Sequence, residues 1–262
     1  MSRSSRHGEL RGVARAFGRL VLPQECAGCG RPDRVLCRRC RALFGEPQRC
    51  EELTQHLAGS QDPPVAPLPT WALATYAGPV RHTVLAWKSG GRPDLTGPLT
   101  AEMARAATVV SPIESPTAPG PVLVVPAPSG AARRRAGRFV VGDLADAFGR
   151  AVAGVSDGPV AVVDLLRRRS GSGHLLGAAA RSRDRAQAVR CQQRLSPGTV
   201  CLLVDDVVTT GATLAACRAA LEESGAIVAA AFALAVTAPP GSGVIELSAV
   251  SKETQRTLRS VD

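Results

Sequence analysis

The sequence predicts an α/β fold, a parallel sheet with helices on both faces, preceded by a small cysteine-rich module. Short apolar segments alternate with helical patterns through the second half of the chain, which is typical of βαβ units. Near the N-terminus, cysteines recur as two closely spaced pairs, the spacing of a metal site. The chain has 262 residues, enough for one large domain or two smaller ones.

The expected elements follow from hydrophobic periodicity and from Gly and Pro breakers. They are, in chain order, helix 10–22, strand 71–76, helices 78–88 and 96–108, strands 122–125 and 160–163, strand 201–204, helix 212–224 and strand 227–236. Helix 139–153 lies between the strands at 122–125 and 160–163, and the Gly/Ser/Arg-rich stretch 167–190 follows them. Because ligands bind at the carboxyl ends of the strands in such sheets, we expect the functional site at that edge.

Composition shifts divide the chain into four regions. Residues 1–58 hold the N-terminal helix and the cysteine module, and residues 59–70 form a Pro-rich linker. Residues 71–238 form the α/β domain, and residues 239–262 form a polar tail.

The charge of the chain is carried almost entirely by arginine. The net charge is +10, and Lys88 and Lys252 are the only lysines. Arginine donates two parallel hydrogen bonds to phosphate, so the composition suggests phosphorylated ligands or nucleic acid, with a solvated basic surface as the alternative.

The composition also bears on location. The longest apolar run, 226–236, is far shorter than the roughly 20 residues that span a bilayer, and no signal peptide is visible. We therefore expect no membrane span and a cytoplasmic location. In that compartment the cysteines are thiols or metal ligands rather than disulfides.

Four cysteines form the pattern C-x2-C-x7-C-x2-C, and they are Cys26, Cys29, Cys37 and Cys40. Each C-x2-C knuckle presents two thiolates, and two knuckles complete a tetrahedral site for one structural Zn2+. A reduced, metal-free loop is the alternative, but so short a polar segment has little core of its own.

The stretch "VCLLVDDVVTTGATL", residues 200–214, ends an apolar strand on two acids. Asp205 and Asp206 repel each other unless a donor or cation lies between them, and a sugar diol with a hydrated Mg2+ nearby meets that need. The segment 209–213 opens a helix whose free N–H groups favour an anion. A diol site beside a phosphate site describes ribose 5-phosphate; a generic strand-to-helix turn is the alternative.

This stretch resembles the phosphoribosyl-pyrophosphate signature of type I phosphoribosyltransferases: an apolar strand, two acids, two apolar residues, then T-x-G-x-T. With the four-cysteine prefix, "YAGPVRHTVLAWKSGGR" and "VVPAPSG", the chain resembles the ComF family over roughly residues 20–237. That family is phosphoribosyltransferase-like and associated with natural competence and DNA uptake. The resemblance implies a type I phosphoribosyltransferase-like sheet and catalytic roles for Asp205, Asp206 and Lys88. It also implies that phosphoribosyl pyrophosphate is bound by Thr209, Thr210, Gly211, Ala212, Thr213, Pro126, Ala127 and Arg92.

Two functions follow as hypotheses. The first is phosphoribosyl transfer from phosphoribosyl pyrophosphate, or binding of a nucleotide, with Mg2+. The second is a non-catalytic protein of DNA uptake that binds single-stranded DNA and a competence helicase through its arginines. The arginine runs 133–135 and 167–169 supply charge for the second, but the chain has few aromatic residues for base stacking.

Overall fold

The computed structural model describes residues 24–51, 67–109, 121–129, 139–156, 158–168 and 189–238. The expected helix 10–22, the tail 239–262, and most of the stretches 59–70 and 167–190 lie outside these residues.

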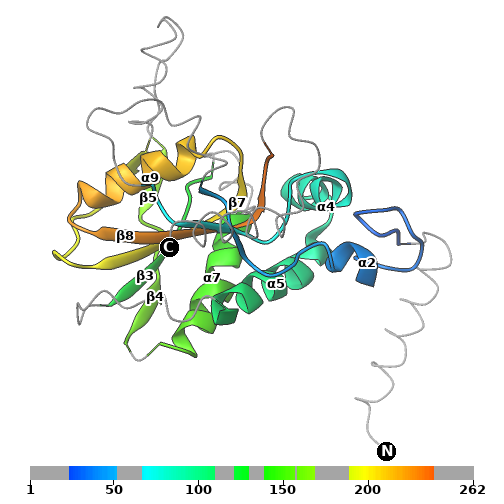
Figure 1. Cartoon of the computed structure of the whole chain (residues 1–262), viewed down its shortest axis with the longest axis horizontal. Coiled ribbons are helices and arrows are strands. Elements are labelled where there is room, and N and C mark those ends of the chain that lie inside the picture. The colour runs from blue at the N-terminus through cyan, green and yellow to red at the C-terminus, as the bar shows by residue number, and fades with distance from the viewer. Residues whose placement is uncertain are drawn as a thin grey trace, which may run out of the picture.

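Within this part of the chain, six strands form the central sheet in the order β1-β2-β8-β7-β3-β4 (Figure 1). Their bounds are β1 Gln48–Arg49, β2 Thr70–Ala72, β3 Val122–Pro126, β4 Val160–Val162, β7 Val200–Val208 and β8 Ile227–Val236. Neighbouring strands from β2 to β4 are parallel, and β1 runs antiparallel along the edge. The predicted parallel sheet is confirmed.

Helices cover both faces of this sheet, as predicted. Helices α5 and α7 pack against each other on one side, and α9 lies on the other side with a short antiparallel pair, β5 and β6 (Figure 1). The bounds are α4 Gly78–Lys88, η1 Pro93–Leu95, α5 Thr96–Val109, α7 Val140–Ala153, α9 Ala212–Glu222, β5 Leu166–Arg168 and β6 Val189–Cys191. None of the described helices is both long and apolar enough to cross a membrane.

Strand β7 explains where the candidate site lies. Its first five residues, 200–204, are buried because helices cover both faces of a parallel strand. The predicted strand 201–204 ends too early: Val207 and Val208 continue the pairing with Ala235 and Val236 of β8. The two acids therefore lie inside the strand, just before its carboxyl end.

The cysteine module is part of the same body as the sheet. Its short helix α2 spans Arg38–Arg41, and β1 follows it and pairs with β2. Phe44 is buried in the main hydrophobic core, and Arg41 forms an ion pair with the buried Glu102 of α5. Strand β1 precedes the Pro-rich stretch 59–70 and β2 begins at its last residue, so the two strands join the module to the sheet.

Candidate functional site

The acid pair of β7 is held by a lysine from α4. The Nζ of Lys88 lies 2.9 Å from Oδ1 and 2.8 Å from Oδ2 of Asp206, which is buried. Asp205 Oδ1 accepts a hydrogen bond of 2.8 Å from the backbone N–H of Asp206. The fold thus brings together three of the predicted site residues, although Lys88 and Asp206 are 118 positions apart in the chain.

The two acids occupy different electrostatic surroundings. Successive side chains of a strand point to opposite faces, so only Asp206 reaches Lys88. Burial, together with the charge of Asp206, raises the pKa of Asp205 to about 8, while Lys88 acts in the opposite direction. At neutral pH Asp205 is mostly protonated and can donate a hydrogen bond to a hydroxyl group. Asp206 instead forms an ion pair with Lys88.

A turn that opens helix α9 follows the strand. Thr209 and Thr210 are exposed, and Gly211 takes a left-handed conformation with φ 70° as the N-cap of α9. Glycine is favoured there because a Cβ atom strains this conformation. The first turn of α9 holds no acidic residue, and Thr210 Oγ1 accepts only a long bond of 3.4 Å from the N–H of Ala212. A helix N-terminus without a carboxylate in its first turn is electrostatically suited to an anion.

Two buried hydroxyls lie at the same edge of the sheet. Ser129 follows β3 and Thr237 follows β8, the two strands that flank β7. Neither hydroxyl oxygen has a hydrogen-bond partner among the described residues. Buried polar groups are almost always paired, so a polar ligand at this edge would meet two hydroxyls that no described residue bonds. The motif-based predictions did not include them; the available signal was that each closely follows the end of a predicted strand.

The remaining predicted residues divide between two places. Pro126 ends β3, and the N–H of Ala127 donates to the carbonyl of Val204 in β7, which places both beside the acid pair's strand. Arg168 of β5 reaches the same loop, where its Nε lies 3.2 Å from the carbonyl oxygen of Pro128. Arg167 pairs with Asp164.

Arg92 is held by the cysteine module instead. Its Nη1 donates to the Glu25 carbonyl at 2.9 Å, and its Nη2 donates to the Val35 carbonyl at 3.3 Å. Its Nε and Nη2 also bond the carboxylate of Asp94. A ligand-binding role for Arg92 stays a prediction and requires these bonds to open.

The four predicted cysteines form one cluster. The Sγ atoms of Cys26, Cys29, Cys37 and Cys40 all lie within 4.8 Å of one another. The Sγ atoms of Cys29 and Cys37 are 3.7 Å apart, close to the separation of about 3.8 Å in a tetrahedron with metal–sulfur bonds of 2.3 Å. The cluster therefore fits a tetrahedral thiolate-bound metal ion.

Backbone amides favour the thiolate form of two cysteines in this cluster, whereas burial raises the pKa of Cys40. The N–H of Cys40 donates to Cys37 Sγ at 3.4 Å and lowers the pKa of Cys37. Burial opposes ionisation of Cys26, but bonds such as the one from the N–H of Cys37, at 3.3 Å, lower its pKa to about 6. Cys50 lies apart in the main core, and burial raises its pKa to about 12.

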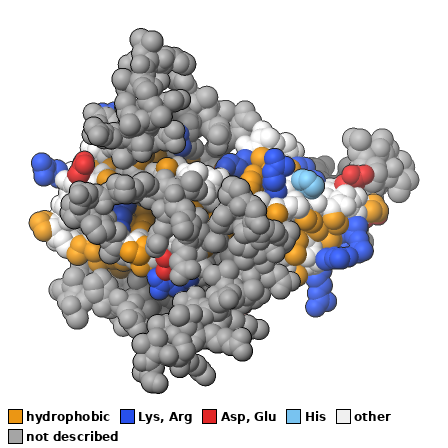
Figure 2. Space-filling view, turned by 45° about the horizontal axis from the view of Figure 1, so that its top comes forward, with side chains coloured by type: hydrophobic (Ala, Val, Ile, Leu, Met, Phe, Trp, Pro, Cys, Tyr) orange, Lys and Arg blue, Asp and Glu red, His pale blue; other side chains and the backbone are white. Residues whose placement is uncertain are grey.

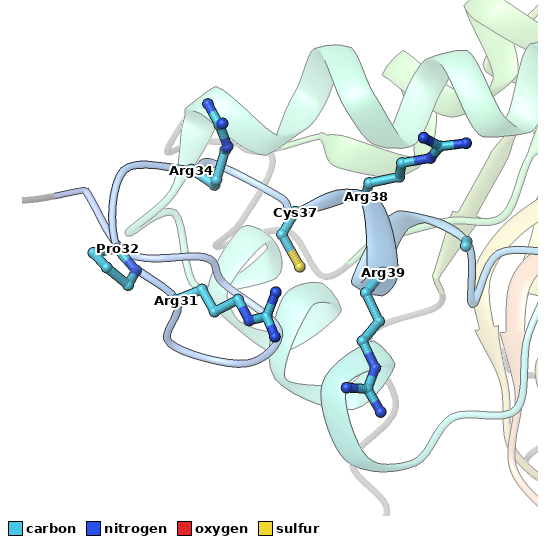
Figure 3. Close-up of a pocket in the computed structure, with 7 residues that line it drawn as sticks. Arg31, Pro32, Arg34, Cys37, Arg38 and Arg39 are labelled. Atoms are coloured by element: carbon cyan, nitrogen blue, oxygen red, sulfur yellow. The ribbon is translucent and has the colours of Figure 1, made fainter.

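A basic hollow adjoins this cluster. Its volume is about 830 Å³, and Arg31, Arg34, Arg38 and Arg39 line it (Figure 3). No guanidinium of these four forms an ion pair with a described residue, whereas Arg41 and Arg49 of the same module are both paired with acids. Basic side chains are visible at the right-hand end of the molecule in Figure 2, the end where Figure 1 places α2.

Comparison with known proteins finds similar solved structures but no matching family. No family model and no curated protein matches the chain. Among solved structures, it is similar to a glutamic acid mutant of an HPRT, made at an invariant aspartic acid, with 20% identity, TM-score 0.32, and 55% of this chain and 66% of that chain covered. It is also similar to a Staphylococcus aureus hypoxanthine phosphoribosyltransferase, with 14% identity, TM-score 0.28, and 55% and 62% covered.

A third similar structure is the hypoxanthine phosphoribosyl transferase of Trypanosoma cruzi, with 18% identity, TM-score 0.33, and 62% of this chain and 92% of that chain covered. The alignments span just under two thirds of the first two structures. At these values the similarities do not carry a function, which has to be argued from the residues of the site.

Proposed function

We propose that the chain binds phosphoribosyl pyrophosphate, or a ribonucleotide 5-phosphate, at the carboxyl edge of β7 and acts as a phosphoribosyltransferase. The observation that carries this proposal is that the acid pair lies near the end of β7 and the turn 209–213 directly follows that strand. Carboxyl groups suit a sugar diol, and the helix N-terminus suits a phosphate.

Each group has a separate part in this proposal. Asp205 and Asp206 hydrogen-bond the ribose hydroxyls, directly or through metal-bound water. The turn donates to the 5-phosphate. Ser129 and Thr237 add two hydroxyls at this edge that bond no described residue. Lys88 holds Asp206 in place and contributes positive charge where the pyrophosphate group leaves.

Two metal ions fit the residues present. The four-cysteine cluster has the donor set of a structural Zn2+ site, and the carboxylates have the hard oxygen donors that Mg2+ prefers. Mg2+, when bound with the substrate, supplies positive charge to the pyrophosphate oxygens.

Calorimetry with phosphoribosyl pyrophosphate and Mg2+ tests the site. Thr210→Val and Thr213→Val should each weaken binding by about 1–3 kcal/mol, because each strands a charged phosphate without one hydroxyl donor. Asp205→Asn with Asp206→Asn should abolish the dependence of binding on Mg2+. Thr100→Val on α5 is the control and should leave the affinity unchanged. Wild-type protein that ignores the ligand at millimolar concentration would overturn the proposal.

Pyrophosphate release then separates transfer from binding alone. Transfer breaks the bond between ribose C1 and the pyrophosphate oxygen and forms a new C1 bond to the acceptor. A screen of nucleobases for pyrophosphate release should find one acceptor that wild-type protein uses and that the double Asn variant does not.

The basic hollow favours a second candidate function, binding of single-stranded nucleic acid through its phosphates. Four arginines line this hollow, and none of them is ion-paired with a described residue. No aromatic residue is among its described lining, so recognition would depend on backbone charge rather than on base stacking. The resemblance to the ComF family adds an expected role in DNA uptake.

Salt-dependent binding of an oligonucleotide tests this candidate. Arg38→Gln with Arg39→Gln should reduce affinity and flatten its dependence on salt, since each phosphate contact releases counterions. Arg150→Gln with Arg218→Gln removes the same charge from α7 and α9 and should have little effect. Equal losses in both double variants would show that only net charge matters and would contradict a site at the hollow.

A further inference from the structure

The cysteine module contacts the segment that carries Lys88 on both sides of that lysine. On the N-terminal side the contacts are made by the middle of α4. His82 Nδ1 lies 3.3 Å from the Gly28 carbonyl oxygen in the first cysteine knuckle. A Cβ atom on Gly28 would lie 2.8 Å from Cys40 Sγ and 3.1 Å from Thr83 Oγ1, so the knuckle packs directly between the cluster and α4.

On the C-terminal side the contacts are made by Arg92 and Asp94, just after α4. The guanidinium of Arg92 donates to the carbonyls of Glu25 and Val35, which flank the two knuckles. Gln24 Nε2 donates to Asp94 Oδ2 at 2.8 Å. Both carbonyls and the glutamine belong to the module, so this end of the segment is also tied to it.

Between these two anchors, Lys88 meets the acid pair. Trp87 is buried, and its Nε1 donates to Thr96 Oγ1 at 2.9 Å, which fixes the last turn of α4 against α5. The next residue extends its ammonium to both oxygens of Asp206. The position of this ammonium therefore depends on where the module holds the chain before and after it.

Ala27, Val35 and Leu36 pack against the main core, but the two knuckles have few apolar residues of their own. The module's separate apolar cluster consists of three buried cysteines, Cys26, Cys37 and Cys40, with Leu36 packed against them. In so small a module, the binding free energy of a metal is folding free energy. The positions of the carbonyls of Glu25, Gly28 and Val35 thus depend on the loaded cluster.

We propose that the metal-loaded cysteine module positions Lys88 against Asp206, with His82 and Arg92 as the positioning residues. Metal loading is then linked to the arrangement of the acid pair, in addition to any effect on stability. The proposal rests on the proposed function only in taking the acid pair as the ligand site; the contact between Lys88 and Asp206 does not depend on a ligand.

The test follows the reactivity of Lys88 in the full chain without ligand. Acetylation of each lysine is followed by peptide mass spectrometry. The chain has two lysines, so the rate at Lys88 is compared with the rate at Lys252 as the internal reference. In zinc-loaded wild type, the carboxylate of Asp206 engages the Lys88 amine and slows its reaction. Asp206→Asn removes the charge of that partner. The acetylation rate of Lys88 in this variant is therefore the reference for a lysine without the ion pair.

Arg92→Gln and His82→Ala should raise the Lys88 rate relative to Lys252 on the order of tenfold, toward the rate in Asp206→Asn, by opening the local contact. Arg41→Gln is the matched control. It removes an ion pair between the module and α5 but no contact beside Lys88, and it should leave the ratio unchanged. Zinc removal by a chelator should reproduce the effect of Arg92→Gln while circular dichroism stays that of the folded chain.

An unchanged Lys88 rate in zinc-loaded Arg92→Gln and His82→Ala would overturn the proposal, even if metal removal unfolds the chain. An equal increase in Arg41→Gln would also overturn it, because the module would then act through general stability. Failure of the chain to bind phosphoribosyl pyrophosphate would leave these rates unaffected and would count only against the proposed function.

Discussion

At the scale of single residues, the acid pair combines two carboxyl groups with one cation. Lys88 reaches Asp206 alone, and Asp205 is left with a backbone N–H and the charge of its neighbour. Its raised pKa is the consequence of this arrangement and of burial. A ligand hydroxyl or cation that needs the ionised form must displace the proton of Asp205, so ligand binding and pH are linked at this residue.

This gives a prediction for Asp205→Asn. The folded pKa is about 8 and the unfolded value is about 4, so the folded state binds the extra proton between these values. Stability of wild type therefore falls as pH rises through this window, and the variant escapes that loss. The free energy of unfolding of Asp205→Asn, measured by thermal unfolding at each pH, should gain on that of wild type between pH 5 and pH 8.5 by about 1–3 kcal/mol.

The control for this experiment is Thr100→Val on α5, which removes a hydroxyl bonded to the carbonyl of Thr96 and no titratable group. Its free energy of unfolding should differ from that of wild type by the same amount at every pH. A constant difference between Asp205→Asn and wild type across the range would contradict a raised pKa.

At the same scale, the sequence predicts the functional groups that belong to a local sequence motif. The paired cysteines come together as their spacing indicates. The resemblance gave Lys88 a catalytic role without a partner, and the structure shows that it contacts Asp206. Ser129 and Thr237 each follow a predicted strand, but only the order of β3, β7 and β8 shows that they lie at one edge of the sheet. The contacts of Arg92 with the module are likewise formed between segments far apart in the chain.

At the scale of elements, local signals determine some boundaries and pairing determines others. Helix 78–88 is observed as predicted, since Pro79 at the first turn starts it and Gly90, with φ 79°, turns the chain after it. The strand at 201–204 was predicted too short because acids interrupt its apolar run. Backbone pairing with β8 does not require apolar side chains, so the ladder continues to Val208.

Packing of α7 on the sheet gives a prediction at this scale. A Cβ atom at Gly149 would lie 2.4 Å from Val162 Cγ2 and 3.7 Å from Val124. Gly149→Ala should therefore destabilise the chain by about 1–3 kcal/mol, because overpacking outweighs the gain of about 1 kcal/mol in helix propensity. Urea unfolding measures the change.

Gly97→Ala on α5 is the matched control for this substitution. No atom lies within 4 Å of its added Cβ atom, so it should be neutral or slightly stabilising. The double variant Gly149→Ala with Val162→Ala should regain part of the loss. If Gly149→Ala is as stable as Gly97→Ala, then α7 does not approach the sheet this closely.

At the scale of the whole molecule, the module and the sheet share one core. Phe44 lies in the main hydrophobic cluster, and Arg105 of α5 donates to the carbonyl oxygens of Phe44 and Gly45. Strand β1 adds its pairing to β2 at the edge of the sheet. These contacts indicate that the two parts unfold together, a conclusion that composition alone could not give because it separates residues 1–58 from residues 71–238.

Metal removal tests this cooperativity. Cys26→Ser with Cys37→Ser should abolish zinc binding, about one ion per chain by elemental analysis of wild type. The same change should lower the stability of the whole chain, by about 4 kcal/mol when free metal exceeds its dissociation constant about 1,000-fold. Cys191→Ser, outside the cluster, is the control and should keep the metal.

Fluorescence and metal release then report on the two parts separately. The chain has two tryptophans, Trp71 in β2 and Trp87 in α4, so fluorescence follows the sheet and the helix that bears Lys88. A chromophoric chelator follows the module. In urea both signals should change at one midpoint, because the loss of β1 and Phe44 removes an edge and a core residue from the sheet. Metal released at a lower urea concentration, with tryptophan fluorescence still native, would instead establish the module as an independent unit.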